Sequence, residues 1–153
     1  LPLVYGQTTK IRDWAIGGVY GQWVQITDGT NKYIRAAVDD GYPLSMWSNR
    51  WSTMPVTAMP RLRLPNPDKR AYLDYMPNTD VPVIRQPFQP GDLLPFWAMS
   101  PAIGDHHLYQ LDQDPFEDEN KVGEPLEDDM IDLLRGALKD MDAPEEQLQR
   151  LGL

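Results

Sequence analysis

The pattern of apolar and polar residues along the first forty positions predicts β-structure. The runs at 14–20 and 22–27 are rich in Trp, Ile, Val and Tyr, which suit a pleated and half-buried surface. The second run is followed by Asp28-Gly29 and then by another β-prone run at 32–38. Two such runs around an Asp-Gly turn predict a β-hairpin, because Gly29 can adopt the positive φ that the turn requires. Three glycines before the hairpin predict a bend or bulge that leads into it: Gly17, Gly18 and Gly21.

The pattern changes in the middle of the chain, where eleven prolines fall within the 59 positions of 43–101. Proline cannot donate to a β-ladder, and it pushes the preceding residue toward extended geometry. The segment also contains many aromatic residues, which disordered segments lack. It therefore predicts an extended strap that packs against the chain's own sheet or against a neighbouring subunit. The aromatic residues are Trp47, Trp51, Tyr72, Tyr75, Phe88, Phe96 and Trp97.

The last part of the chain has a helical pattern. Apolar residues recur there at three- and four-residue intervals and form one stripe on a helix. Asp128 and Asp129 precede the stripe and suit the start of a helix, because their charge complements the helix dipole. Pro144 and Glu145 predict the start of a second, short helix that ends at Gly152. The stripe consists of Met130, Leu133, Leu134, Ala137, Leu138 and Met141, and the short helix adds Leu148 and Leu151.

These patterns together predict a mainly β fold with extended proline-rich loops and a C-terminal α-helical segment, around a small β-sandwich or barrel-like core. The 153 residues have the length of one ordinary domain. We expect a β- and loop-rich body at 1–111, which includes the proline-rich middle at 43–101. An acidic linker at 112–127 then leads to the helical segment at 128–153.

Charge is distributed unevenly between the body and the end of the chain. Residues 1–100 carry ten Lys and Arg against eight Asp and Glu, a balance of +2, whereas residues 101–153 carry four against fifteen, a balance of −11. The net charge of −9 argues against direct binding of nucleic acid. The acidic end suits a solvated region or an arm for a basic partner.

The absence of cysteine excludes disulfides, cysteine-ligated metals and thiol nucleophiles. No run of about 18 apolar residues is present, so no membrane span is predicted. We expect a soluble protein in the cytoplasm or within a particle, rather than a disulfide-rich extracellular one.

Candidate catalytic and metal-binding residues are few. The only histidines are the adjacent pair His106 and His107, which could bind one metal ion together with Asp112 only from a loop. The chain lacks a Gly-rich phosphate loop and a Gly-x-Ser-x-Gly elbow. The sequence therefore favours a non-catalytic protein without a cofactor or metal. A small metal-dependent or hydrolytic enzyme centred on the two histidines stays as an alternative.

A second alternative is a carbohydrate- or ligand-binding β-module. Trp47 and Trp51, with Arg50 between them, could stack against a sugar ring or another flat ligand and supply a polar contact. Tryptophans are also efficient core residues in a small domain that prolines interrupt. Packing is therefore the favoured interpretation of the cluster, and ligand stacking is the alternative.

The interpretation that joins most features is a structural or interaction subunit of a larger assembly. Capsid decoration, neck and tail proteins of virions are of this kind, and so are accessory subunits of large complexes. An amphipathic terminal helix can dock in a groove of another subunit, of the same or a different chain. The predicted partner-binding residues are Met130, Leu133, Leu134, Leu138, Met141, Leu148 and Leu151.

Overall fold

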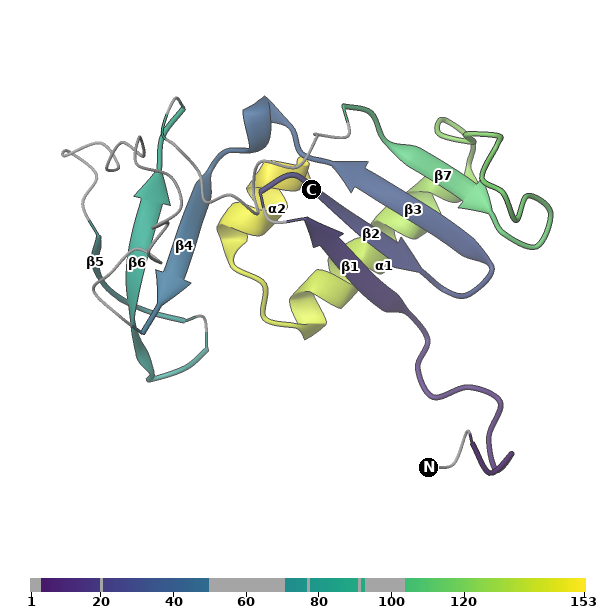
Figure 1. Ribbon diagram of the computed structural model, residues 1–153, viewed down its shortest axis with the longest axis horizontal. Coiled ribbons are helices and arrows are strands. Elements are labelled where there is room, and N and C mark those ends of the chain that lie inside the picture. The colour runs from purple at the N-terminus through teal and green to yellow at the C-terminus, as the bar shows by residue number, and fades with distance from the viewer. Residues whose placement is uncertain (1–3, 20, 50–70, 77, 91, 93–103) are drawn as a thin grey trace, which may run out of the picture.

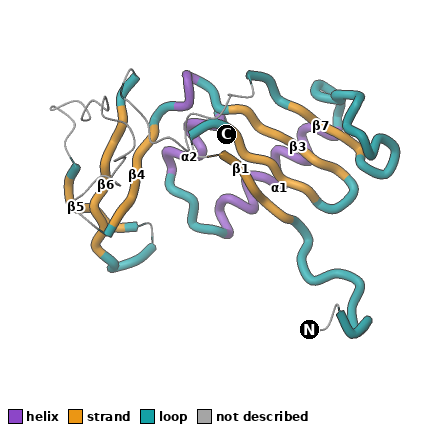
Figure 2. Tube along the Cα trace, in the orientation of Figure 1, coloured by secondary structure: helices purple, strands orange, loops and turns teal. Residues whose placement is uncertain are grey.

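The computed structural model describes residues 4–19, 21–49, 71–76, 78–90, 92 and 104–153. Within these ranges the chain forms seven strands, one short 3-10 helix and two α-helices (Figures 1 and 2). The elements in chain order are β1 (Ala15–Val19), β2 (Trp23–Thr27), β3 (Asn31–Ala36), η1 (Asp39–Gly41), β4 (Leu44–Ser48), β5 (Tyr72–Tyr75), β6 (Pro82–Phe88), β7 (His107–Gln110), α1 (Leu126–Asp140) and α2 (Glu145–Leu151).

The first sheet is antiparallel and has the strand order β1-β2-β3-β7. Its centre is the predicted hairpin, which is confirmed: β2 and β3 pair with Thr27 opposite Lys32. The Oδ1 atom of Asp28 accepts the backbone N–H groups of Thr30 and Asn31 at 2.8 and 2.7 Å, and Gly29 has a φ of 99°. The turn residues therefore set the register of the two central strands.

The glycines before the hairpin are placed differently from the prediction. Gly17 and Gly18 lie inside β1, paired in register with Gln25 and Val24, and only Gly21, with a φ of 75°, lies in the turn. A Cβ atom at Gly18 would lie 2.5 Å from the carbonyl oxygen of Trp23. Gly18 thus permits a close approach of β1 to β2 and does not bend the chain.

The described part of the proline-rich middle is extended and forms a sheet of its own. This second sheet is antiparallel with the order β4-β6-β5, so the proline-containing strand β6 is its central strand. Prolines are tolerated there because Pro82 is the first residue of β6 and Pro87 is next to its last. Arg85, between them, is opposite Trp47 of β4 and Tyr72 of β5.

Helix α1 follows the predicted stripe and begins two residues before Asp128. It covers one face of the first sheet (Figure 1). Its buried residues join the sheet residues Ile26, Tyr33 and Leu108, which have no exposed surface, in one core. The helix residues of this core are Met130, Leu134, Ala137 and Leu138, with Leu151 from α2.

The acidic stretch predicted as a linker is anchored to the first sheet. The Nζ atom of Lys32 in β3 forms an ion pair with Glu117 at 2.7 Å. Asn120 Oδ1 accepts the backbone N–H of Leu108, and the backbone N–H of Lys121 donates to the carbonyl of the same leucine at 2.9 Å. The loop before α1 is therefore held at two points along its length.

The predicted fold class is confirmed. Within the described residues the chain is mainly β, with two open antiparallel sheets in a sandwich-like arrangement and two C-terminal helices. None of the described helices has the length and apolar character needed to cross a membrane.

Candidate functional site

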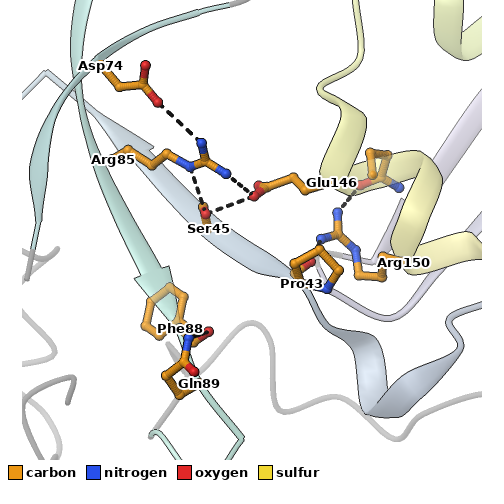
Figure 3. A network of polar contacts seen from close by, with 9 residues as sticks. Pro43, Ser45, Asp74, Arg85, Phe88, Gln89, Glu146 and Arg150 are labelled. Atoms are coloured by element: carbon orange, nitrogen blue, oxygen red, sulfur yellow. Dashed lines mark hydrogen bonds and ion pairs between the residues drawn. The ribbon is translucent and has the colours of Figure 1, made fainter. Parts of the chain in front are cut away.

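A network of polar contacts surrounds Arg85 of β6 (Figure 3). Its Nε donates to Ser45 Oγ at 3.0 Å, its Nη2 to Glu146 Oε2 at 2.6 Å and its Nη1 to Asp74 Oδ2 at 3.3 Å. Ser45 Oγ also donates to Glu146 Oε2 at 2.9 Å. This network, which we call the Arg85 network, joins all three strands of the second sheet to the first turn of α2.

The Arg85 network is shielded from solvent on its α2 side. Glu146 is 7% exposed and Ser45 is 4% exposed. Burial alone would lower the pKa of Arg85, but the hydrogen bond and negative charge of Glu146 outweigh burial and raise this pKa. The ion pair therefore holds Arg85 in its charged form, and the network acts as a structural connection between the second sheet and α2.

The network does not form a nucleophilic site. A serine nucleophile needs a neighbouring base that can accept its proton. The carboxylate nearest to Ser45 is that of Glu146, which is already paired with Arg85. Both histidines belong to the other sheet, at the start of β7.

Trp47, one of the predicted ligand-stacking residues, contacts the same arginine. The guanidinium carbon of Arg85 lies 4.8 Å from the centre of the Trp47 ring, in a cation–π arrangement. Arg50 and Trp51 lie outside the described residues. One face of Trp47 is thus covered by its own chain, and the sugar-binding alternative remains a prediction.

The two histidines make separate contacts. His106 Nδ1 accepts the backbone N–H of Ala36 at 3.1 Å, and burial, together with the positive charge of Arg35, lowers the pKa of His106. His107 Nδ1 lies 3.0 Å from the hydroxyl of Tyr109. No three His, Cys, Asp or Glu side chains in the described part of the chain are grouped so that they could hold a metal ion. The alternative metal site of His106, His107 and Asp112 is therefore not formed.

The residues of the helical stripe fall into two groups. Met130, Leu134, Leu138 and Leu151 are at most 3% exposed and belong to the core of their own fold. Another subunit could reach them only if α1 and α2 left the first sheet. Leu133 and Leu148 are half-buried, and Met141, which is 50% exposed, is the one stripe residue with a largely accessible side chain.

Met141 lines an open groove that the sequence does not reveal. The groove has a volume of about 420 Å³ and runs beside β1, the outer strand of the first sheet. Its other wall is the connection between α1 and α2, with Met76 from the end of β5. Most lining residues are apolar or glycine. The sequence does not reveal the groove, because its walls come from segments that are distant from one another along the chain.

Among the described residues, two segments each expose three or more large apolar side chains. The segment that precedes β1 presents Val4, Tyr5 and Ile11, which are 74, 73 and 63% exposed. We call residues 4–14 the N-terminal arm. Trp14, at its base, packs against the core of the first sheet, and the residues before it extend away from both sheets (Figures 1 and 2). The second segment is β5 with the loop that follows it, at the opposite side of the molecule (Figure 1). Its exposed residues are Tyr72, Leu73, Tyr75, Met76 and Val81.

Comparison with known proteins gives no family model, no curated protein and no solved structure that matches the chain.

Proposed function

We propose that the chain is a non-catalytic structural or interaction subunit of a larger protein assembly, built from copies of this chain or from this chain and others. The observation that carries the proposal is the exposure of large apolar side chains on the N-terminal arm and on β5. Val4 and Tyr5 are each nearly three-quarters exposed, and Leu73 and Tyr75 are more than half exposed. Contiguous exposed apolar residues are typical of protein interaction sites.

The position of these residues supports contacts with more than one neighbour. The arm and β5 lie on opposite sides of the molecule (Figure 1), so a neighbour at one segment does not occupy the other. Subunits with two different contact surfaces can join head to tail into rings or filaments. Components of viral particles, such as capsid decoration, neck or tail proteins, are assembled in this manner, as are accessory subunits of large complexes.

The charge distribution supports the same kind of contact. The acidic end of the chain is folded around α1, where Glu127, Asp128 and Asp129 occupy the first turn. The body has a balance of +2 and the end of the chain one of −11. A neighbour's more basic surface would be attracted to this acidic part, and such attraction favours a defined orientation of association.

The experiment that tests the proposal replaces exposed apolar residues of β5 and measures mass against concentration by light scattering. In the double variant Leu73→Thr and Tyr75→Thr, threonine retains the preference for β-structure but removes the apolar surface. We expect the dissociation constant of the assembly to rise at least about tenfold, equivalent to about 1.4 kcal/mol. A fluorescence melt verifies that the double variant is folded.

The matched control is Val122→Thr, in the loop before α1, where the valine is 39% exposed. We expect it to associate like the unmodified chain. If the folded double variant also keeps the mass curve of the unmodified chain, the exposed residues of β5 are not an assembly surface.

A further inference from the structure

Among the described residues, the backbone groups on the outer edge of β1 have no partner strand. The turn between β2 and β3 closes with a hydrogen bond from the N–H of Asp28 to the carbonyl of Asn31. Hydrogen-bonded pairs alternate with non-bonded pairs along an antiparallel ladder, so Ile26 and Val24 also direct their backbone groups toward β3. The intervening residues of β2 bond to β1, where their partners are Ala15, Gly17 and Val19. Ile16 and Gly18 therefore direct their N–H and C=O groups away from the sheet. In the described part of the chain, no strand lies beside this edge.

The edge lacks the features that usually prevent pairing with another strand. Natural edge strands are protected by charged side chains, prolines or bulges. The sequence of β1 is Ala-Ile-Gly-Gly-Val, and all five residues pair in regular register with β2. Gly17 and Gly18 are exposed, and without side chains they leave the backbone open to close approach.

The groove beside β1 would cover the apolar side chains of an added strand. Ile16, Leu138 and Met141 contribute to its walls, and Met76 lies opposite β1. Among the described lining residues, Asp142 alone is charged. Its Oδ1 accepts a hydrogen bond from the neutral Asn78 side chain at 2.6 Å, and no described cation pairs with it. Arg135 and Lys139 line a neighbouring pocket together with Asp142, so the groove favours an apolar strand with at most a small positive charge.

The N-terminal arm has this character. It presents three large apolar side chains to solvent, and Lys10 and Arg12 exceed its single carboxylate, Asp13. The eleven residues of the arm can span about 36 Å when extended, whereas a five-residue strand such as β1 needs about 17 Å. A stable interface needs roughly 800 Å² from each partner. A five-residue strand alone supplies too little, so the apolar side chains of the arm must take part.

We propose that the N-terminal arm of a second copy of this chain adds to β1 as an extra strand and covers the groove beside it. The backbone of the arm would bond to Ile16 and Gly18, its apolar side chains would enter the groove, and its cations would approach Asp142. The inference rests on the proposed assembly function and names one of its contacts. Because each copy has one arm and one groove, the contact is head-to-tail and can propagate along a row of copies.

The test uses two full-length variants with complementary defects. In the arm variant, Val4, Tyr5 and Ile11 are replaced by serine, and its groove stays intact. In the groove variant, Met141→Lys places a charge in the groove while the arm stays intact. We expect each variant alone to have a dissociation constant at least tenfold higher than that of the unmodified chain in light scattering. We expect an equimolar mixture to form dimers, since one good contact is possible between the two variants and no further contact can follow.

The control for the groove variant is Phe116→Lys, which makes the same change in charge at a residue that is 84% exposed and lies in the loop before α1. This control should associate like the unmodified chain. If Met141→Lys does not fold, Met141→Gln replaces it, because glutamine removes the apolar surface at this wall of the groove without adding a charge.

The result distinguishes the two proposals. If the unmodified chain associates and the folded arm and groove variants do so equally well, the arm does not bind β1, while assembly through another surface such as β5 stands. If the variants are defective but their mixture stays monomeric, the arm and the groove are not partners. If the unmodified chain is monomeric at every concentration, the arm does not bind β1 of another copy, and assembly from copies of this chain fails as well.

Discussion

Tyr33 shows how a single polar atom is accommodated in the core. Its side chain is fully buried under α1, and its hydroxyl donates to Glu127 Oε1 at 2.9 Å and accepts from Arg35 Nη1 at 3.0 Å. Arg35 in turn donates from its Nε to the carbonyl of Leu151 at 2.8 Å. One hydroxyl thus connects β3 to the start of α1 and, through Arg35, to the end of α2. Buried polar atoms that have all their partners in this way help to define a unique packing.

The ionisation of Tyr33 predicts a loss of stability in alkaline solution. Burial raises the pKa of Tyr33 from 10.0 to about 12, and the Arg35 hydrogen bond opposes this rise. Below pH 10 both the folded and the unfolded chain hold this proton, and the stabilising effect is complete. Between pH 10 and about 12 the unfolded chain ionises first, so stability falls as the pH rises.

The measurement is urea unfolding at a series of pH values, in the unmodified chain and in Tyr33→Phe. At neutral pH we expect Tyr33→Phe to lose about 1–3 kcal/mol, because Glu127 and Arg35 lose their common partner. From pH 10 to about 12 the variant should lose less stability than the unmodified chain. Parallel curves for the two proteins would show that Tyr33 does not carry this pH dependence.

At the scale of elements, the apolar stripe of α1 determines where the helix lies. Leu134 has no exposed surface and belongs to the core of the first sheet, while its neighbour Leu133 is only half-buried. Both residues are leucine, so they have the same side-chain size and the same helix propensity. Their substitution therefore separates the effect of burial against the sheet from any effect on the helix itself.

We expect Leu134→Ala to lower the free energy of unfolding by about 2–5 kcal/mol, as truncations in well-packed cores do. Leu133→Ala should lose much less, and both are measured by denaturant unfolding followed by tryptophan fluorescence. Equal losses in the two variants would contradict the packing described here. A Leu134→Ala variant that keeps its stability but loses association would indicate that α1 leaves the sheet and docks on a neighbour.

The elements that could be predicted from the sequence are those that depend on contacts between residues close together in the chain. The hairpin of β2 and β3 follows from Asp28-Gly29, and α1 follows from its apolar spacing, because turn geometry and helical periodicity involve neighbouring residues. Gly17 and Gly18 indicated a bend and instead lie in a strand. Glycine permits both arrangements, and only the pairing of Gly17 with Gln25 and of Gly18 with Val24 shows which one is present.

The second sheet and the candidate sites could not be predicted in this way. In β6, Pro82 and Pro87 argue against a central strand, and their position near its ends becomes visible only when the pairing is known. The Arg85 network joins Ser45 to Glu146, which is 101 positions further along the chain. The groove beside β1 likewise combines β1 with the connection between the helices. No spacing in the sequence records such contacts, since they depend on how distant segments pack.

At the scale of the whole molecule, the C-terminal residues connect the two sheets. Glu146 pairs with Arg85 of the second sheet, and the carbonyl of Arg150 accepts the backbone N–H of Val38 after β3 at 2.8 Å. Arg150, which is 5% exposed, also donates to the carbonyl of Pro43 before β4. Helix α2 is thus bonded to both halves of the fold. The N-terminal arm extends beyond this connected body, β5 forms an outer edge of it, and both carry exposed apolar side chains.

We propose that this exposed apolar surface brings copies of the chain together. The most direct test is light scattering on the purified, full-length and unmodified chain over a wide range of concentration. We expect the average molecular mass to rise with concentration, toward the mass of a discrete oligomer or of a growing row of copies. A compact monomer at every concentration would contradict this proposal.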